Sequence, residues 1–280
     1  MEHLELDLRL VRNHLTRFLS ESVTGAGFRR AVLGLSGGVD SSLVAALAVE
    51  ALGAEQVLGL ILPWRGSSPA SAADARALAE TLRMPVREID ISPATEAFAR
   101  SLEGAGLPGD PLDARRLGNV MARCRMVCIF DAALAWQALP LGTSNKSELL
   151  LGYGTWHGDL ASAINPIGDL YKRQVFALAR EMALPAAILD KAPSADLEAG
   201  QTDEADLGWS YDLIDRILVR AVDLRRSRAE IVAEGFAQAD VDGILDRVAR
   251  HHFKRMPPVV AKVGARAIGA DWLYQRDSRL

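Results

Sequence analysis

The sequence predicts an α/β fold in which helices cover both faces of a doubly wound parallel sheet. Four short apolar runs have the length of strands buried on both faces: residues 31–35, 57–62, 86–91 and 139–143. Segments with helical spacing of apolar residues separate these runs, and such alternation is typical of parallel sheets. Beyond residue 195 the chain is expected to be mostly helical. We therefore predict a doubly wound domain with a helical C-terminal part.

The helices follow from apolar spacing and from the residues that end it. The first helix is predicted to end before Gly25 and the second before Gly53, because glycine commonly terminates helices. A third is predicted to end near Met84. Apolar positions wrap a wide face of the segment 112–138, which predicts a long, mostly buried helix. Further helices are predicted over residues 94–102, 206–224 and 227–248.

The turn after the first strand is the most informative part of the chain. Residues 36–41 read SGGVDS, and helical spacing begins directly after them. The two glycines allow a tight turn whose amides point inward, and the serines add hydroxyl donors at the positive end of a helix. This arrangement predicts a cradle for an anion. Asp40 would lie badly beside bound phosphates unless a divalent cation were shared with them.

The same motif separates the classes of nucleotide site. A dinucleotide fingerprint requires GxGxxG and a Walker loop requires GxxxxGK[ST], and no Lys follows these glycines. SGGVDS instead resembles the signature of the ATP pyrophosphatase superfamily, whose loop holds the β and γ phosphates of ATP as a leaving group. The resemblance implies adenylyl transfer, in which a substrate oxygen attacks the α-phosphorus. The alternative is an ordinary Gly-Gly turn with an Asp near a helix start.

Two further groups of polar residues have predicted partners. Arg65, Ser67 and Ser68 follow the second strand, at the sheet edge where ligands bind, and are predicted to face the nucleotide; a solvated loop is the alternative. Arg123 and Arg125 lie in an apolar stretch, where a guanidinium needs an anionic partner. For Arg125 a structural carboxylate is the favoured partner.

Composition and charge exclude several classes of protein. The net charge of −4 gives no electrostatic footprint for nucleic acid. No apolar run is long enough for a membrane span, and the N-terminal segment is too charged for a signal peptide, so we predict a cytoplasmic protein. Cys124 and Cys128 lack CxxC spacing and are predicted to be core thiols. The 280 residues, 49% of them apolar, suffice for one domain over residues 1–280.

Six sequence blocks together resemble the NAD synthetases. They are SGGVDS, NVMARCRM, LGTSNKSE, GDLYKRQV, KAPSADL and FKRMPP, in the family's order and at similar spacing. The resemblance implies an adenine nucleotide alpha hydrolase-like fold and the ATP-dependent amidation of deamido-NAD. In that reaction the nicotinate carboxylate is adenylated, pyrophosphate leaves, and ammonia displaces AMP to give NAD. The family also implies Mg²⁺ as a cofactor and a homodimer.

The resemblance also assigns roles to individual residues. Asp40 and Lys172 are implied to be catalytic, and Asp40 and Glu148 to hold Mg²⁺, which neutralises the triphosphate. The residues implied to bind ATP are Gly34, Leu35, Ser36, Gly37, Gly38, Val39, Asp40, Ser41, Thr143, Lys172 and Ser194. Arg123, Phe253 and Lys254 are implied to bind deamido-NAD, although Phe253 and Lys254 would also suit a packing pair at a helix end.

The stretch TWHGDLASA departs from the commoner bacterial pattern of the family. Trp156 stands where those members have Lys, and Ala163 where they have a second Asp, although GYGTWHGD is closer to glutamine-dependent and some archaeal members. We predict that Trp156 stacks on the pyridine ring of deamido-NAD, with His157 or Asp159 hydrogen-bonded to the ribose. The alternative is that Trp156 belongs to the core.

Free ammonia is the predicted nitrogen donor. Glutamine-using members carry a large amidase domain ahead of the synthetase part, whereas this chain reaches its phosphate loop by residue 36. A separate amidase as the ammonia source is compatible with this reading. Residues 191–206 are polar and acidic and are predicted to form a loop that closes over the adenylate. Two rival functions are another ligase of the superfamily, GMP synthetase-like or tRNA-modifying, and a nucleotide-binding regulator without catalysis.

Overall fold

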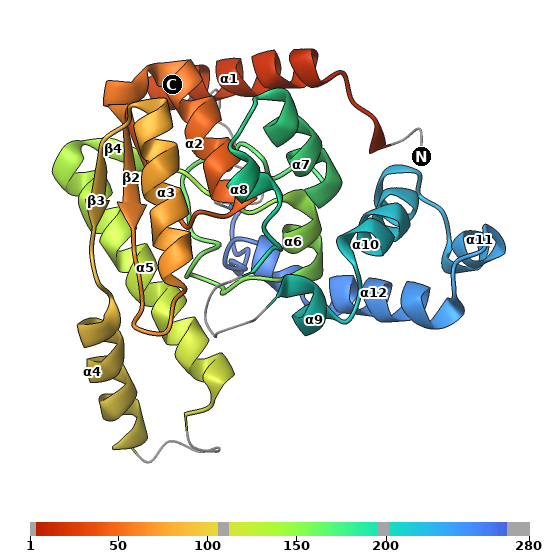
Figure 1. The fold of residues 1–280 in the computed structure, drawn as a ribbon. Helices are drawn as coiled ribbons and strands as arrows, with labels where there is room; N and C mark the ends of the chain where they lie inside the picture. The colour runs from red at the N-terminus through yellow and green to blue at the C-terminus, as the bar shows by residue number, and fades with distance from the viewer. Residues whose placement is uncertain (1–3, 106–111, 195–201, 268–280) are drawn as a thin grey trace.

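A four-stranded parallel sheet forms the centre of the molecule. The computed structural model describes residues 4–105, 112–194 and 202–267. The strand order is β3-β2-β1-β4, and every neighbouring pair is parallel. The strands are β1 (Arg30–Gly34), β2 (Val57–Ile61), β3 (Val86–Glu88) and β4 (Ala138–Pro140). Helices pack on both sides of this sheet (Figure 1), so the predicted doubly wound architecture is confirmed.

Alternate residues of β1 face two separate cores, because strand side chains point to opposite faces of a sheet. Ala31 and Leu33 pack into a cluster with the helices of one face. Those helices are α1 (Leu8–Gly25), α2 (Val39–Leu52), α3 (Pro69–Leu82), α7 (Lys172–Glu181) and α8 (Ala186–Leu189). Val32 packs on the other face against Met121 and Cys124 of α5 (Ala114–Trp136), beside which lies α4 (Ser92–Glu103). A short turn, η2 (Ala54–Gln56), leads into β2.

Two strands are shorter than the sequence predicts. The third is predicted to reach Ile91 but β3 ends at Glu88, and the fourth is predicted to reach Thr143 but β4 ends at Pro140. For β3 the physical reason is a proline on the neighbouring strand, because it has no amide hydrogen with which to continue the ladder. Opposite the lost end of β3 lies Pro63, whose carbonyl still accepts the Ile91 N–H at 3.0 Å. In β4, by contrast, the Leu141 N–H still donates to the Val32 carbonyl at 2.8 Å, so Pro140 does not interrupt that pairing.

Helix α5 has an exposed apolar side, so the prediction of a mostly buried helix is wrong for that side. Val127, Phe130 and Leu134 are 59%, 40% and 82% exposed. Their spacing of three and four residues places them on one stripe of the helix. Cys124 is buried and Cys128 is half-buried; both are free thiols, as predicted.

The C-terminal part is helical, as predicted, and has its own core. Its elements are α9 (Asp203–Leu207), α10 (Tyr211–Leu218), the π-helical turn η3 (Val219–Asp223), α11 (Arg228–Ala233), α12 (Gln238–Arg250) and η4 (His252–Arg255). Their buried apolar residues cluster with Leu151 of α6 (Lys146–Leu151) and with Tyr171. None of the described helices combines the length and the apolarity needed to cross a lipid bilayer.

Helix α6 is not among the helices predicted from the sequence. Its signal was the pattern Asn-x-x-Glu: Asn145 and Glu148 form a capping box, in which each side chain binds the backbone amide of the other. The predicted closing loop 191–206 is described only at its two ends. Residues 195–201 lie outside the described part of the chain, and α9 begins at Asp203.

Candidate active site

The candidate site lies at the carboxyl ends of β1 and β4, which are neighbouring strands of the sheet. β2 and β4 flank β1, and the chain reaches them by crossing opposite faces of the sheet. The loop after β1 and the segment after β4 therefore lie side by side at the point where the strand order reverses. Ligands of doubly wound sheets bind at such a switch point.

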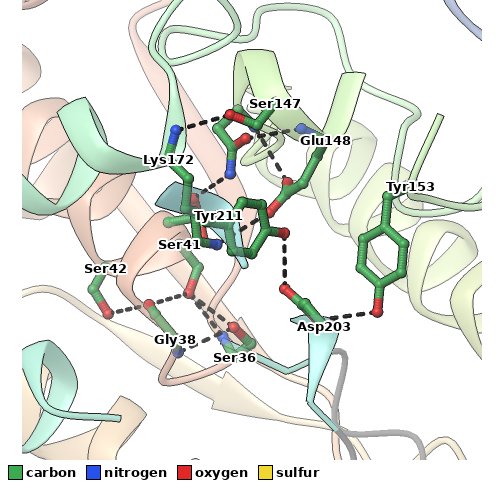
Figure 2. A network of polar contacts seen from close by, with 12 residues as sticks. Ser36, Gly38, Ser41, Ser42, Ser147, Glu148, Tyr153, Lys172, Asp203 and Tyr211 are labelled. Carbon is green, nitrogen blue, oxygen red and sulfur yellow. Dashed lines mark hydrogen bonds and ion pairs between the residues drawn. The ribbon is translucent and has the colours of Figure 1, made fainter. Parts of the chain in front are cut away.

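The loop after β1 is folded back on itself by its serines. Gly38 N–H donates to Ser36 Oγ at 3.2 Å, and Ser36 N–H donates to Ser41 Oγ at 3.2 Å. The hydroxyls of Ser36 and Ser41 are 3.0 Å apart, and that of Ser42 donates to the Gly38 carbonyl at 2.7 Å (Figure 2). Gly38 is the N-cap of α2 and has no side chain to cap the first turn. The amides of that turn are therefore suited to an anion.

Gly37 is required by both conformation and space. Its φ is +77°, in the left-handed region, and a Cβ would lie 2.3 Å from the carbonyl oxygen of Ser71 on α3. Lys191 also binds the start of α3: its Nζ donates to Ser71 Oγ at 2.9 Å and lies 3.2 Å from Asp74 Oδ2. The loop after β1 is thus packed tightly against the start of α3.

Lys172 joins two carboxylates from separate segments. Its Nζ is 2.5 Å from Asp40 Oδ2 and 3.1 Å from Glu148 Oε1, and its side chain is only 2% exposed. Asn145, which is not among the residues predicted from sequence, donates from Nδ2 to Asp40 Oδ1 at 2.9 Å. Asp40, Glu148 and Lys172 lie in the first turns of α2, α6 and α7. Three helix N-termini therefore converge on one buried cluster.

Burial shapes the electrostatics of this cluster. It raises the pKa of Glu148 to about 8, an effect that Lys172 opposes and Asp40 reinforces. Burial alone would lower the pKa of Lys172, but the carboxylates of Asp40, Glu148 and Asp203 raise it above its ordinary value. Lys172 therefore stays protonated. One ammonium faces several carboxyl groups, so the site favours either a further cation or protonation of one carboxylate.

The two carboxylates offer hard oxygen ligands of the kind that Mg²⁺ prefers. Within residues 4–105, 112–194 and 202–267, no three His, Cys, Asp or Glu side chains are grouped as a metal site. Magnesium sites in ATP-using enzymes commonly take one or two carboxylates and complete their coordination with phosphate oxygens and water. Asp40 and Glu148 fit such a site.

A second layer of polar groups surrounds Lys172. Tyr211 and Tyr153 donate their hydroxyls to the two carboxylate oxygens of Asp203, each at 3.1 Å (Figure 2). The Lys172 ammonium lies 5.0 Å from the centroid of the Tyr211 ring. Burial raises the pKa of Tyr211 and that of Asp203 above their ordinary values. No local pattern links these residues in the chain, which is why sequence reasoning missed them.

The aromatic residues predicted to bind deamido-NAD gather at one surface. The rings of Trp156 and His157 have centroids 4.4 Å apart, and Phe253 meets Trp156 edge-on at 5.5 Å. Arg123 donates from Nη2 to the Trp156 carbonyl at 3.3 Å. Trp156 is 37% exposed and Phe253 is 51% exposed. The alternative of a core tryptophan therefore does not describe Trp156.

Lys254 and two arginines cap the C-terminal end of α6. Lys254 Nζ donates to the carbonyls of Gly152 and Gly154 at 2.8 and 2.7 Å. Arg247 and Arg255 donate to three further carbonyls, those of residues 149–151. An ammonium has three donors, so Lys254 commits two of them to this cap. The structure thus gives Lys254 a role in holding the helix that carries Glu148.

Four further residues predicted from the sequence are Thr143, Ser194, Arg65 and Arg125. Thr143 lies half-buried between β4 and α6, and Ser194 is exposed. Arg65 is paired with Glu96 of α4 at 2.5 Å, so its charge is directed to that helix rather than to the phosphate loop. Arg125 donates from Nε to the backbone carbonyl of Leu62, just after β2, at 3.1 Å. The sequence predicts a carboxylate as its partner instead.

Comparison with known proteins places this arrangement in a family. Residues 11–258 match the family model described as NAD synthase. The chain belongs to the NAD synthase family. The NH(3)-dependent NAD(+) synthetase of Trichlorobacter lovleyi is 48% identical over 277 residues, which are 99% of each chain.

Solved structures similar to this member of the NAD synthase family share its fold. The NH3-dependent NAD synthetase from Campylobacter jejuni, in complex with the nitrate ion, matches with a TM-score of 0.76 and 33% identity, over 92% of this chain and 100% of that one. The NMN synthetase from Francisella tularensis matches with a TM-score of 0.80 and 33% identity, over 92% and 99%. The expected adenine nucleotide alpha hydrolase-like fold is thereby confirmed.

Proposed function

We propose that the chain catalyses the ATP-dependent amidation of deamido-NAD to NAD, with ammonia as nitrogen donor and AMP and pyrophosphate as the other products. The observation that carries this proposal is the buried cluster of Lys172, Asp40 and Glu148 beside the phosphate loop. Relatives named NH(3)-dependent NAD(+) synthetase, aligned over 99% of the chain, support the same reaction.

The residues of the site have distinct roles in this reaction. The amides at the start of α2 and the hydroxyls of Ser36 and Ser41 bind the β and γ phosphates. The Lys172 ammonium adds a positive charge that stabilises the leaving pyrophosphate. The nicotinate carboxylate attacks the α-phosphorus and the bond to pyrophosphate breaks. Ammonia then attacks the acyl carbon, AMP leaves, and the nitrogen loses a proton. Positioning and electrostatic stabilisation supply the catalysis.

Asp40 and Glu148 would hold a magnesium ion together with phosphate oxygens. Their position on two segments that meet at Lys172 suits an ion shared between the protein and ATP. When bound, Mg²⁺ would neutralise the triphosphate and polarise the leaving group.

Pyrophosphate release by the purified chain tests the proposal. We expect release to require ATP, deamido-NAD and ammonium together, and NAD to form in an equal amount. Glutamine alone is expected to give little product, and its efficient use would contradict ammonia as the donor. No release with deamido-NAD would reject the proposed reaction. A nucleotide-binding regulator would bind ATP without release, and a different ligase would respond only to its own substrate.

A second candidate substrate is nicotinate mononucleotide. A structural neighbour, with a TM-score of 0.80, is named NMN synthetase, and amidation of the mononucleotide acid would use the same adenylation chemistry. The kcat/KM values for the two acids, measured in one assay, separate the candidates. A higher value for the mononucleotide would replace deamido-NAD as the proposed substrate.

Trp156→Ala is expected to raise the KM for deamido-NAD about tenfold, equivalent to about 1.4 kcal/mol of binding. The exposed ring lies beside His157 and Phe253 and offers a face on which a pyridine can stack. The KM for ATP should change little, because the phosphate loop is a separate contact surface. Steady-state kinetics with each substrate varied in turn give both values.

Trp136→Ala is the matched control for this variant. Trp136 ends α5, and its ring stacks under the Arg30 guanidinium at 5.2 Å rather than at the proposed substrate surface. The control is expected to lower the melting temperature and leave both KM values unchanged. Unchanged KM values in Trp156→Ala, with only thermal stability reduced, would assign substrate recognition elsewhere.

The proposed enzyme is a cytoplasmic homodimer. The exposed stripe of Val127, Phe130 and Leu134 on α5 supports association, because contiguous exposed apolar side chains mark interaction surfaces. Free thiols at Cys124 and Cys128 suit a reducing compartment. Light scattering should give twice the chain mass of 30.2 kDa, and Leu134→Glu should reduce it. A monomeric mass for the unmodified chain would reject the dimer.

A further inference from the structure

Asp215 of α10 is a buried carboxylate that the proposed reaction does not use. It has 0% exposure, and burial raises its pKa to about 6. Its Oδ1 accepts the Ser147 hydroxyl at 2.5 Å, and its Oδ2 accepts the Arg173 N–H at 2.9 Å. Burying a carboxylate is costly unless it is well hydrogen-bonded. Its partners therefore indicate what the residue holds in place.

Both partners adjoin the residues of the proposed site. Ser147 precedes Glu148 on α6, and its hydroxyl oxygen also accepts the Lys172 N–H at 3.0 Å (Figure 2). Arg173 follows Lys172. The first two amides of α7 thus bind side chains from α6 and α10 instead of an intrahelical partner. One carboxylate connects the segment that carries Glu148 to the segment that carries Lys172.

The same helix makes a second attachment to these two segments. The π-helical turn η3 continues α10, and Asp223 at its end accepts the Tyr171 hydroxyl at 2.7 Å and the Lys146 ammonium at 2.9 Å. Single π-helical turns occur frequently at functional sites. Asp215 and Asp223 therefore bind residues on either side of Lys172 and just before Glu148. Of the two, Asp215 is the fully buried one. It is linked to the Lys172 backbone by one intervening side chain, that of Ser147.

We propose that Asp215 is a positioning residue that sets the Lys172 ammonium against Asp40 and Glu148 for binding of the ATP phosphates. The proposal rests on the proposed function only in assigning ATP to this site. Asp215 acts through its hydrogen bonds to Ser147 and Arg173, and its charge also favours the N-terminus of α7. Loss of these bonds lets the start of α7 shift relative to α6, which moves the Lys172 ammonium away from the phosphates.

A double-mutant cycle with Lys172 tests this role. The probe is α,β-methylene-ATP, whose cleavable bond is blocked, and its affinity is measured by calorimetry so that turnover is not needed. Asp215→Asn keeps the shape but cannot accept the Ser147 hydroxyl and the Arg173 N–H together as the carboxylate does. We expect the dissociation constant to rise about tenfold in Asp215→Asn, and less than about twofold when the same change is made in Lys172→Met.

The control variant and the outcomes separate positioning from general stability. Val241→Ala leaves a cavity in the C-terminal core, and Val241 has no polar link to the site. This variant should lower the melting temperature and leave the dissociation constant unchanged. Equal losses of affinity with and without Lys172, or no loss in Asp215→Asn, would overturn the proposal.

Ser147→Ala serves as a second variant if Asp215→Asn does not fold. It removes the link to the Lys172 N–H and should reproduce the loss of affinity and its dependence on Lys172. An additive effect would overturn the proposal. If the unmodified chain binds the analogue but does not amidate deamido-NAD, the proposed function fails, while the cycle still measures the coupling between Asp215 and Lys172.

Discussion

Asp40→Asn and Glu148→Gln are each expected to lower kcat for NAD formation by about 1000-fold or more. Each carboxylate lies within 3.1 Å of the Lys172 ammonium, and each is proposed to hold Mg²⁺. The amide variants keep the side-chain shape and remove only the charge. They are preferable to alanine variants, which would also remove side-chain atoms from the cluster and leave a cavity there.

The rate is measured as pyrophosphate release at saturating substrates, and folding is followed by circular dichroism. Glu50→Gln is the matched control, since Glu50 lies near the other end of α2 and pairs with Arg12 at 2.8 Å. We expect this control to keep normal kcat. Near-normal turnover in either site variant would reject the assignment of that carboxylate.

Gly37→Ala is expected to raise the KM for ATP by about 100-fold, equivalent to about 2.7 kcal/mol. The positive φ of +77° costs a residue with a Cβ about 1–2 kcal/mol. The methyl group would also lie 2.3 Å from the Ser71 carbonyl oxygen, so the loop must move away from α3. That movement displaces the amides proposed to bind the phosphates.

Gly53→Ala is the matched control for Gly37→Ala, because it introduces backbone strain without forcing a loop to move. Gly53 follows the other end of α2 with a φ of +89°, and a Cβ there would meet no atom within 4 Å. The control should therefore lower the free energy of unfolding by about 1–3 kcal/mol and leave the KM for ATP unchanged. A normal KM for ATP in Gly37→Ala would show that ATP phosphates bind elsewhere.

The strands and the glycine turn after β1 could be predicted because their signals are local. A buried strand, a glycine turn and a helix follow one another within residues 31–52, and each is specified by its own side chains. The end of β3 could not be predicted in the same way. Pro63 ends the pairing of a neighbouring strand rather than its own, so its effect depends on strand order, which a single segment does not contain.

The residues of the site also divide into those that a sequence signal indicated and those that it did not. Asp40, Glu148 and Lys172 were associated through family resemblance, while Asn145, Tyr211 and Asp203 had no such signal and are seen only in the folded chain. The raised pKa values of Glu148 and Asp203 depend on burial, and burial depends on helices that come from distant parts of the sequence. The capping box that begins α6 is the exception, because Asn145 and Glu148 lie within one turn and could have been recognised.

The sequence by itself determined the fold class, the glycine turn after β1 and the resemblance to the NAD synthase family, because short-range apolar patterns and motifs carry these. Tertiary structure alone decided which charges share the buried cluster, that Val127, Phe130 and Leu134 of α5 are exposed, and that Asp215 binds the segments carrying Glu148 and Lys172. The physical reason is that burial and charge pairing belong to packed surfaces. Those surfaces form only when helices from distant parts of the chain pack against the sheet and against one another.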